Sequence, residues 1–130
     1  YKTIQLDPGD LSSHLNMGLL LVKLGRFSQA EPLLQKTINL APDEHTGYQE
    51  LSRLYLRMKK NLPEARRLAQ KAVTLAPSAE TYHDLGLACF VNNDCNAAVA
   101  AMQRAMELDP HSPRYESAYQ LFRQQQEASR

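Results

Sequence analysis

The sequence LSSHLNMGLLLVKLGRFSQAEPLLQKTINLAP, residues 11–42, decides the fold because the rest of the chain repeats it. The endings KAVTLAP and RAMELDP close two later copies at Pro77 and Pro110, and YKTIQLDP closes an earlier one at Pro8. Together with Pro42, these prolines are spaced by 34, 35 and 33 residues. A period of about 34 residues is typical of solenoids built from helix-turn-helix units. The sequence therefore predicts a stack of helix pairs.

A large apolar residue stands beside a small one in the middle of the first predicted helix of every unit. The three pairs are Met17-Gly18, Leu51-Ser52 and Leu85-Gly86. A small side chain lets two helices approach closely, whereas a larger one forces their backbones apart. We therefore expect Gly18 and Gly86 to lie at helix crossings.

The second predicted helix of each unit carries an alanine at its packing position, namely Ala30, Ala65 and Ala98. Together with the large-small pair and the closing proline, this pattern resembles the tetratricopeptide repeat family over essentially the whole chain. His14 departs from the family's frequent aromatic residue, which Tyr48 and Tyr82 retain. The resemblance implies an all-α fold: a right-handed α-solenoid of helix-turn-helix repeats with a C-terminal capping helix.

We expect one domain over residues 1–130, with three antiparallel helix pairs and a terminal helix. Its parts are the tail of a truncated repeat (1–8), three repeats (11–42, 45–77 and 79–110) and the capping helix (112–126). Tyr115, Ala118, Tyr119 and Phe122 form the apolar face of that last helix. Because the chain opens inside a repeat, we expect it to be part of a longer protein.

Helix ends can be placed from individual residues. Gly25 is expected to end the first complete helix in the left-handed conformation. Ser28 with Glu31 predicts a capping box for the next helix, which places Pro32 in its first turn. Ser78 is the predicted N-cap of the third unit.

Composition restricts the class of protein. With 43% hydrophobic and 22% charged residues the chain reads as a folded domain. A net charge of +1 gives no strong attraction to the phosphates of a nucleic acid, so no nucleic-acid partner is expected. No apolar run approaches the roughly 18 residues of a membrane span, so no membrane partner is expected, while the compartment stays open.

Charge is uneven along the chain. Between Arg53 and Lys71 the sequence has seven basic residues and the single acid Glu64. This basic stretch has two interpretations: a solvated helix edge, or a docking surface for an acidic protein segment.

The residues offer little catalytic chemistry. The sequence has no glycine-rich phosphate loop, no paired histidines followed by an acid, and no cluster of Cys and His ligands. Each of the four histidines, His14, His45, His83 and His111, is alone in its segment. Cys89 and Cys95 replace apolar residues of the other units, so we interpret them as buried free thiols. We expect no enzyme, no cofactor and no metal site.

The resemblance implies that a concave groove carries the function. Its positions hold Leu15, Asn16, Leu19, Val22, Lys23, Gln49, Glu50, Arg53, Leu56, Arg57, His83, Asp84, Leu87 and Phe90. The implied function is a non-catalytic module that docks a peptide or helical segment of a partner protein. The alternative is a structural spacer or self-association domain within a larger protein. Self-association would use the N-terminal edge, where Ile4, Leu6, Leu20 and Leu24 lack an upstream partner, and upstream repeats could equally cover the groove leucines.

One known ligand class fits poorly. Family members that hold acidic chaperone tails use Lys, Asn, Asn, Lys and Arg at five groove positions. Here those positions hold Leu15, Leu19, Glu50, Glu80 and Asp84, so no cation remains and three acids would repel a carboxylate. We expect instead a segment with apolar anchors and an acidic residue facing Arg53.

Overall fold

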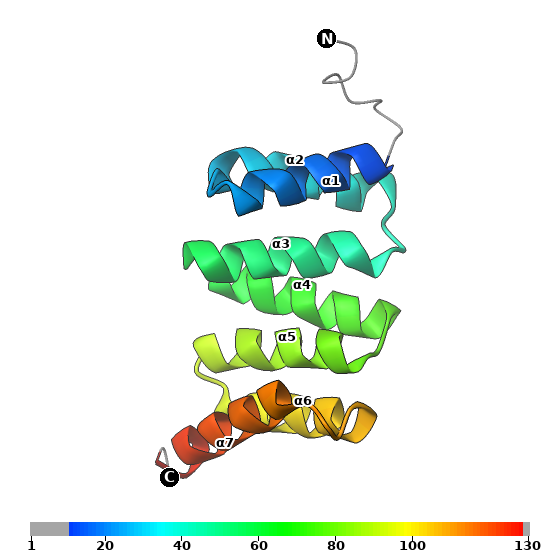
Figure 1. Cartoon of the computed structure of the whole chain (residues 1–130). Helices are drawn as coiled ribbons and strands as arrows, with labels where there is room; N and C mark the ends of the chain where they lie inside the picture. The colour runs from blue at the N-terminus through cyan, green and yellow to red at the C-terminus, as the bar shows by residue number, and fades with distance from the viewer. Residues whose placement is uncertain (1–10, 129–130) are drawn as a thin grey trace.

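A computed structural model describes residues 11–128, and within them the chain forms seven α-helices and no strand. The helices are α1 (Leu11–Lys23), α2 (Phe27–Leu40), α3 (His45–Met58), α4 (Leu62–Leu75), α5 (Ala79–Val91), α6 (Cys95–Leu108) and α7 (Pro113–Ala128). Consecutive helices pair, and the pairs stack into a column that α7 closes beside α6 (Figure 1). The predicted all-α solenoid with a C-terminal capping helix is confirmed.

The first helix of each pair forms one face of the column. α3 packs directly on α1 and on α5, whereas no contact of similar extent joins α2, α4 and α6 to one another. Because the first helices lie closer together than the second ones, the stack curves toward them. The surface of α1, α3 and α5 is therefore its inner face.

Small residues lie at the helix crossings, as predicted. A Cβ on Gly18 would lie 3.0 Å from Leu34 Cδ2, and a Cβ on Gly86 would lie 3.1 Å from Met102 Sδ. Gly47 makes a third close approach, which the sequence analysis missed. Its Cβ would lie 2.9 Å from Ile38 Cγ1 and 3.2 Å from the Ile38 backbone nitrogen. The start of α3 therefore packs against the backbone of α2.

The predicted helix ends agree with the structure in two cases. Gly25 has φ 77°, as expected for a left-handed residue after a helix. The Ser78 hydroxyl accepts the Thr81 N–H at 3.2 Å, and Thr81 Oγ1 accepts the Ser78 N–H at 2.9 Å, which closes a capping box.

The predicted capping box of α2 is wrong. This helix begins at Phe27, with Arg26 as an N-cap that makes no side-chain capping bond. Glu31 instead accepts a hydrogen bond from the Tyr55 hydroxyl of α3 at 2.7 Å. Because the helix starts earlier than predicted, Pro32 lies inside it, beyond the first turn. The Glu31 carboxylate therefore bonds to the neighbouring unit instead of capping its own helix.

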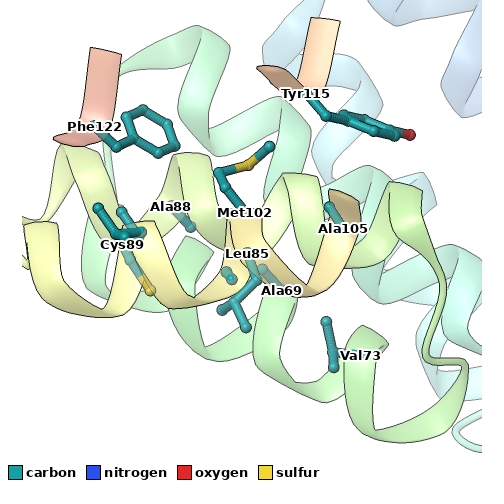
Figure 2. Close-up of a cluster of buried hydrophobic side chains, with 12 residues drawn as sticks. Ala69, Val73, Leu85, Ala88, Cys89, Met102, Ala105, Tyr115 and Phe122 are labelled. Carbon is teal, nitrogen blue, oxygen red and sulfur yellow. The ribbon is translucent and has the colours of Figure 1, made fainter. Parts of the chain in front are cut away.

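A hydrophobic cluster joins the last four helices, α4 to α7 (Figure 2). Phe122 of α7 is fully buried, and its ring stacks on Phe90 of α5 with 4.6 Å between centroids. Tyr115, two α7 turns nearer the N-terminus, is 5% exposed. Cys89 is buried in the same cluster and Cys95 is half-buried, both as free thiols. The predicted apolar face of α7 thus binds the helix to α5 and α6.

Candidate binding groove on the inner face

A charged cluster occupies the middle of the inner face. Arg53 reaches from α3 to α5, where its Nε lies 3.0 Å from Asp84 Oδ2 and its Nη2 lies 3.0 Å from Glu80 Oε2. Gln49 Nε2, one turn before Arg53, donates to the same Asp84 oxygen at 2.8 Å. Glu50 Oε2 lies 3.5 Å from Arg53 Nη1. Asp84, only 4% exposed, is therefore held by two side chains of the preceding unit.

Electrostatics match this geometry. Burial by itself would lower the pKa of Arg53, but the charge and hydrogen bond of Asp84, with Glu80 and Glu50, raise it overall. Burial raises the pKa of Glu50, and the nearby Arg53 charge opposes that shift only in part. The charge of Arg53 is engaged by the protein's own acids. These internal partners argue against our expectation that Arg53 faces an acidic residue of the partner.

Six of the seven basic residues between Arg53 and Lys71 also contact internal partners. Besides Arg53, the ion-paired members are Lys60 with Glu31, Arg66 with Asp94, and Arg67 with Glu64. Lys71 lies over the Tyr48 ring and Arg57 over the Phe27 ring. These contacts favour the interpretation of this stretch as a solvated helix edge over that of a continuous docking surface.

A hollow of about 330 Å³ opens beside the charged cluster. It is lined by Arg53, Leu56, Arg57, Glu80, His83, Asp84, Leu87 and Arg114. Seven of these, Glu80 included, occupy groove positions named in the sequence analysis, and the structure brings them together from α3 and α5. Arg114 was missed, because the sequence analysis treated α7 only as a cap. In the structure α7 continues the row of first helices and adds its own residue to the hollow.

His83 lies between the cluster and α7. Its ring centroid is 5.2 Å from that of Tyr115, and its Nδ1 lies 3.9 Å from Asp84 Oδ1, beyond hydrogen-bond range. Burial, followed by the charge of Arg114, lowers the pKa of His83. The imidazole is therefore neutral near pH 7.

The other predicted groove residues lie outside the hollow. Gln49 and Glu50 support it from within the charged cluster. The ring of Phe90 is half-buried against Phe122, so this residue serves the packing of α7. The remaining five belong to α1: Leu15 and Val22 pack toward the core, Leu19 is half-buried, and Asn16 and Lys23 are exposed.

Residues 11–128 also bear on metal binding and on membrane insertion. No three His, Cys, Asp or Glu side chains converge there as a metal site would need. None of the described helices has the length and apolar character needed to cross a membrane.

Solved structures with this fold include two that are described as binding a peptide or having a peptide-binding site. The first TPR domain of human RPAP3 superposes with a TM-score of 0.86 at 20% identity, covering 94% of this chain and 96% of that one. The first TPR of Spaghetti (RPAP3) bound to the HSP90 peptide SRMEEVD gives 0.84 at 22%, covering 93% and 96%. YrrB, described as a TPR protein with an unusual peptide-binding site, gives 0.81 at 20%, covering 93% and 62%. At these identities the likeness shows the fold alone.

Sequence comparison names the family. A tetratricopeptide repeat model matches residues 15–80, and a second one matches residues 79–112. No curated protein sequence matches the chain. The repeat period, the stacked helix pairs and the two family models agree, and the chain belongs to the tetratricopeptide repeat family.

Proposed function

We propose that the chain is a non-catalytic interaction module that docks a peptide or helical segment of a partner protein on its inner face. The observation that carries this proposal is the hollow between α3, α5 and α7, which combines apolar and charged walls. Tetratricopeptide repeats generally mediate protein–protein interaction, and the family is typically non-catalytic. The hollow is where we expect that contact to form.

The apolar wall of the hollow suits an anchoring side chain. Leu56 and Leu87 are half-buried, so each retains apolar surface that a ligand can cover. Removing such surface from water contributes roughly 25 cal/mol per Å². Interface hot spots are side chains packed in desolvated pockets inside a rim that excludes water, and an apolar side chain seated on Leu56 and Leu87 would fit this pattern. A volume of about 330 Å³ accommodates an anchor of a segment rather than the whole segment.

The relatives support a peptide ligand, but the residues of this chain do not favour an acidic chaperone tail. One structural neighbour holds the HSP90 peptide SRMEEVD, which ends in acids. In the present chain Glu50, Glu80 and Asp84 surround Arg53 and already provide the carboxylates that it binds. An incoming acidic tail would have to displace them against their own negative charge. We therefore expect weak or no binding of SRMEEVD.

The test uses a panel of acetylated and amidated amphipathic peptides, with fluorescence anisotropy as the readout. Leu87→Asp should weaken any peptide that binds by at least about tenfold, because it places a charge in the apolar wall. Leu121→Asp is the matched control, since Leu121 is 52% exposed on α7 and does not line the hollow. Absence of binding across the panel, or an equal loss in both variants, would reject this function.

Self-association is the second candidate, and an exposed apolar edge favours it. Leu20 and Leu24 of the first unit are 48% and 60% exposed. Ile4 and Leu6, which we assigned to the same edge, lie outside the described residues. If this edge pairs two copies, sedimentation velocity should show a concentration-dependent dimer that Leu24→Lys abolishes. A monomer up to about millimolar concentration would exclude the pairing.

A further inference from the structure

Three arginines line the hollow, and they differ in what they already bind. Arg53 is surrounded by Glu50, Glu80 and Asp84. Arg57 and Arg114 make no ion pair with any residue between 11 and 128, and both are exposed. Among the cations of the hollow, these two therefore keep their charge available for a ligand.

Aromatic rings hold the two arginines in place. The Arg57 guanidinium lies 5.3 Å from the Phe27 ring centroid. Arg114 lies 5.1 Å from the Tyr115 ring centroid, and its Nη2 is 3.3 Å from the Tyr115 hydroxyl. A guanidinium stacked on a ring still presents its N–H edge to a carboxylate, in a geometry that is partly fixed beforehand. Less rotamer freedom is then lost when a carboxylate binds.

The two arginines lie on opposite sides of the apolar wall. Arg57 belongs to the last turn of α3 and Arg114 to the first turn of α7, while α5 with Leu87 runs between these helices. The hollow therefore has a cation at each flank. Its middle carries the carboxylates of Glu80 and Asp84 around Arg53, which disfavour a further negative charge there.

From this arrangement we propose that the hollow recognises an internal partner segment with an apolar anchor flanked on both sides by acidic residues, and that Arg57 and Arg114 read those acids. The inference rests on the proposed docking function and names its partner chemistry. Charge complementarity selects the occupant: the apolar side chain covers Leu56 and Leu87, and one carboxylate goes to each flank. Arg53 holds the groove together and does not contact the ligand's acids.

The experiment compares two short peptides, both acetylated and amidated so that they mimic an internal segment. One carries a Leu-Leu anchor with two Glu on each side, and the other has Gln in place of each Glu. In fluorescence anisotropy the Glu peptide should bind about tenfold tighter at about 50 mM NaCl, and this advantage should shrink at about 300 mM because salt screens exposed charges.

Single variants assign the effect to the two arginines. Arg57→Gln and Arg114→Gln should each reduce the affinity for the Glu peptide about threefold or more and leave the Gln peptide nearly unchanged. Arg67→Gln removes the same charge from α4, outside the hollow, and should change neither affinity. Circular dichroism and the thermal midpoint should match the parent chain, because both arginines are exposed.

The outcomes separate this proposal from the general docking function. The proposed role of Arg57 and Arg114 is wrong if both peptides bind equally, or if Arg67→Gln lowers the affinity for the Glu peptide as much as Arg57→Gln does. The docking function would still stand. If neither peptide binds and the amphipathic panel also fails, the docking function itself is rejected. Loss of the Glu preference in Arg57→Gln and Arg114→Gln alone, with Leu87→Asp weakening both peptides, would support the assignment.

Discussion

The junction between the first and second units differs in chemistry from the junction between the second and third. At the first, Gly47 approaches the backbone of Ile38 and the Phe27 ring lies under Arg57. Its main polar link is the Tyr55 hydroxyl on Glu31, where burial followed by that hydrogen bond raises the pKa of Tyr55 to about 12. At the second junction a buried carboxylate, Asp84, organises the contact.

This difference implies different weaknesses. A close apolar contact is most sensitive to added volume, because neighbouring backbone cannot move away cheaply. A buried charge is most sensitive to losing one partner, because the remaining ion is left desolvated and unpaired. In a solenoid, stability is approximately a sum of unit terms and nearest-neighbour terms, so damage at one junction can uncouple the units on its two sides.

The largest effect should come from Arg53→Met. It leaves Asp84 buried with Gln49 as a neutral partner, and we expect a loss of about 2 to 3 kcal/mol in urea unfolding. This value lies below that for fully enclosed ion pairs because the Arg53 side chain is 35% exposed. Adding Asp84→Asn should recover part of the loss. Hydrogen exchange should show that α5–α7 lose coupling to α1–α4; unchanged stability in Arg53→Met would refute the charged-junction account.

Added volume at the first junction should have the next largest effect. Gly47→Ala should destabilise by about 1 to 2 kcal/mol, since the new Cβ meets the Ile38 backbone nitrogen at 3.2 Å. Gly86→Ala is the matched control inside the third unit, where the Cβ meets the flexible Met102 side chain. The gain in helix propensity should offset most of that contact. Equal thermal midpoints for the two variants would contradict the distinction.

A smaller loss is expected within the second unit. Ser52 is fully buried at the crossing of α3 and α4, where its hydroxyl donates to the Ala65 carbonyl at 2.8 Å. Ser52→Ala should cost about 0.5 to 1.5 kcal/mol, because the hydrogen bond disappears while the small volume is kept. Because this change leaves both junctions intact, the urea transition should shift without broadening. Broadening would mean that the crossing also couples the units.

The smallest effect concerns pH. The folded state lowers the pKa of His83, because burial disfavours the charged imidazole. Neutral His83 therefore contributes fully to stability above the pKa of the unfolded state, near 6.5. This contribution is lost as the pH falls through the lower pKa of the folded state. Charged groups facing the imidazole are Arg53 of α3, Glu80 and Asp84 of α5, and Arg114 of α7. His83→Gln should flatten the decline of the free energy of unfolding below about pH 6.5. An unchanged slope would show that His83 does not titrate with unfolding.

The repeat period, the order of helices and the small residues at two crossings could all be predicted from the sequence. Each depends on spacing within a unit: large-small pairs such as Leu85-Gly86 must face a neighbouring helix whatever surrounds them. Left-handed Gly25 and the Ser78 N-cap are equally local. Family positions also identified seven residues of the hollow, because a repeat places equivalent residues on one face.

Only the tertiary structure decided which charges are available. Arg53 and Asp84 come from different units, and nothing in the periodicity says that one side chain will reach the other. The same holds for Glu31, which bonds to Tyr55 of the next unit instead of forming the predicted cap. It also holds for Arg114, because α7 places this residue beside α5. Local spacing determines which face a residue lies on. Whether an ion is paired or free depends on long side chains meeting across helices, and this contact is settled only when the units pack.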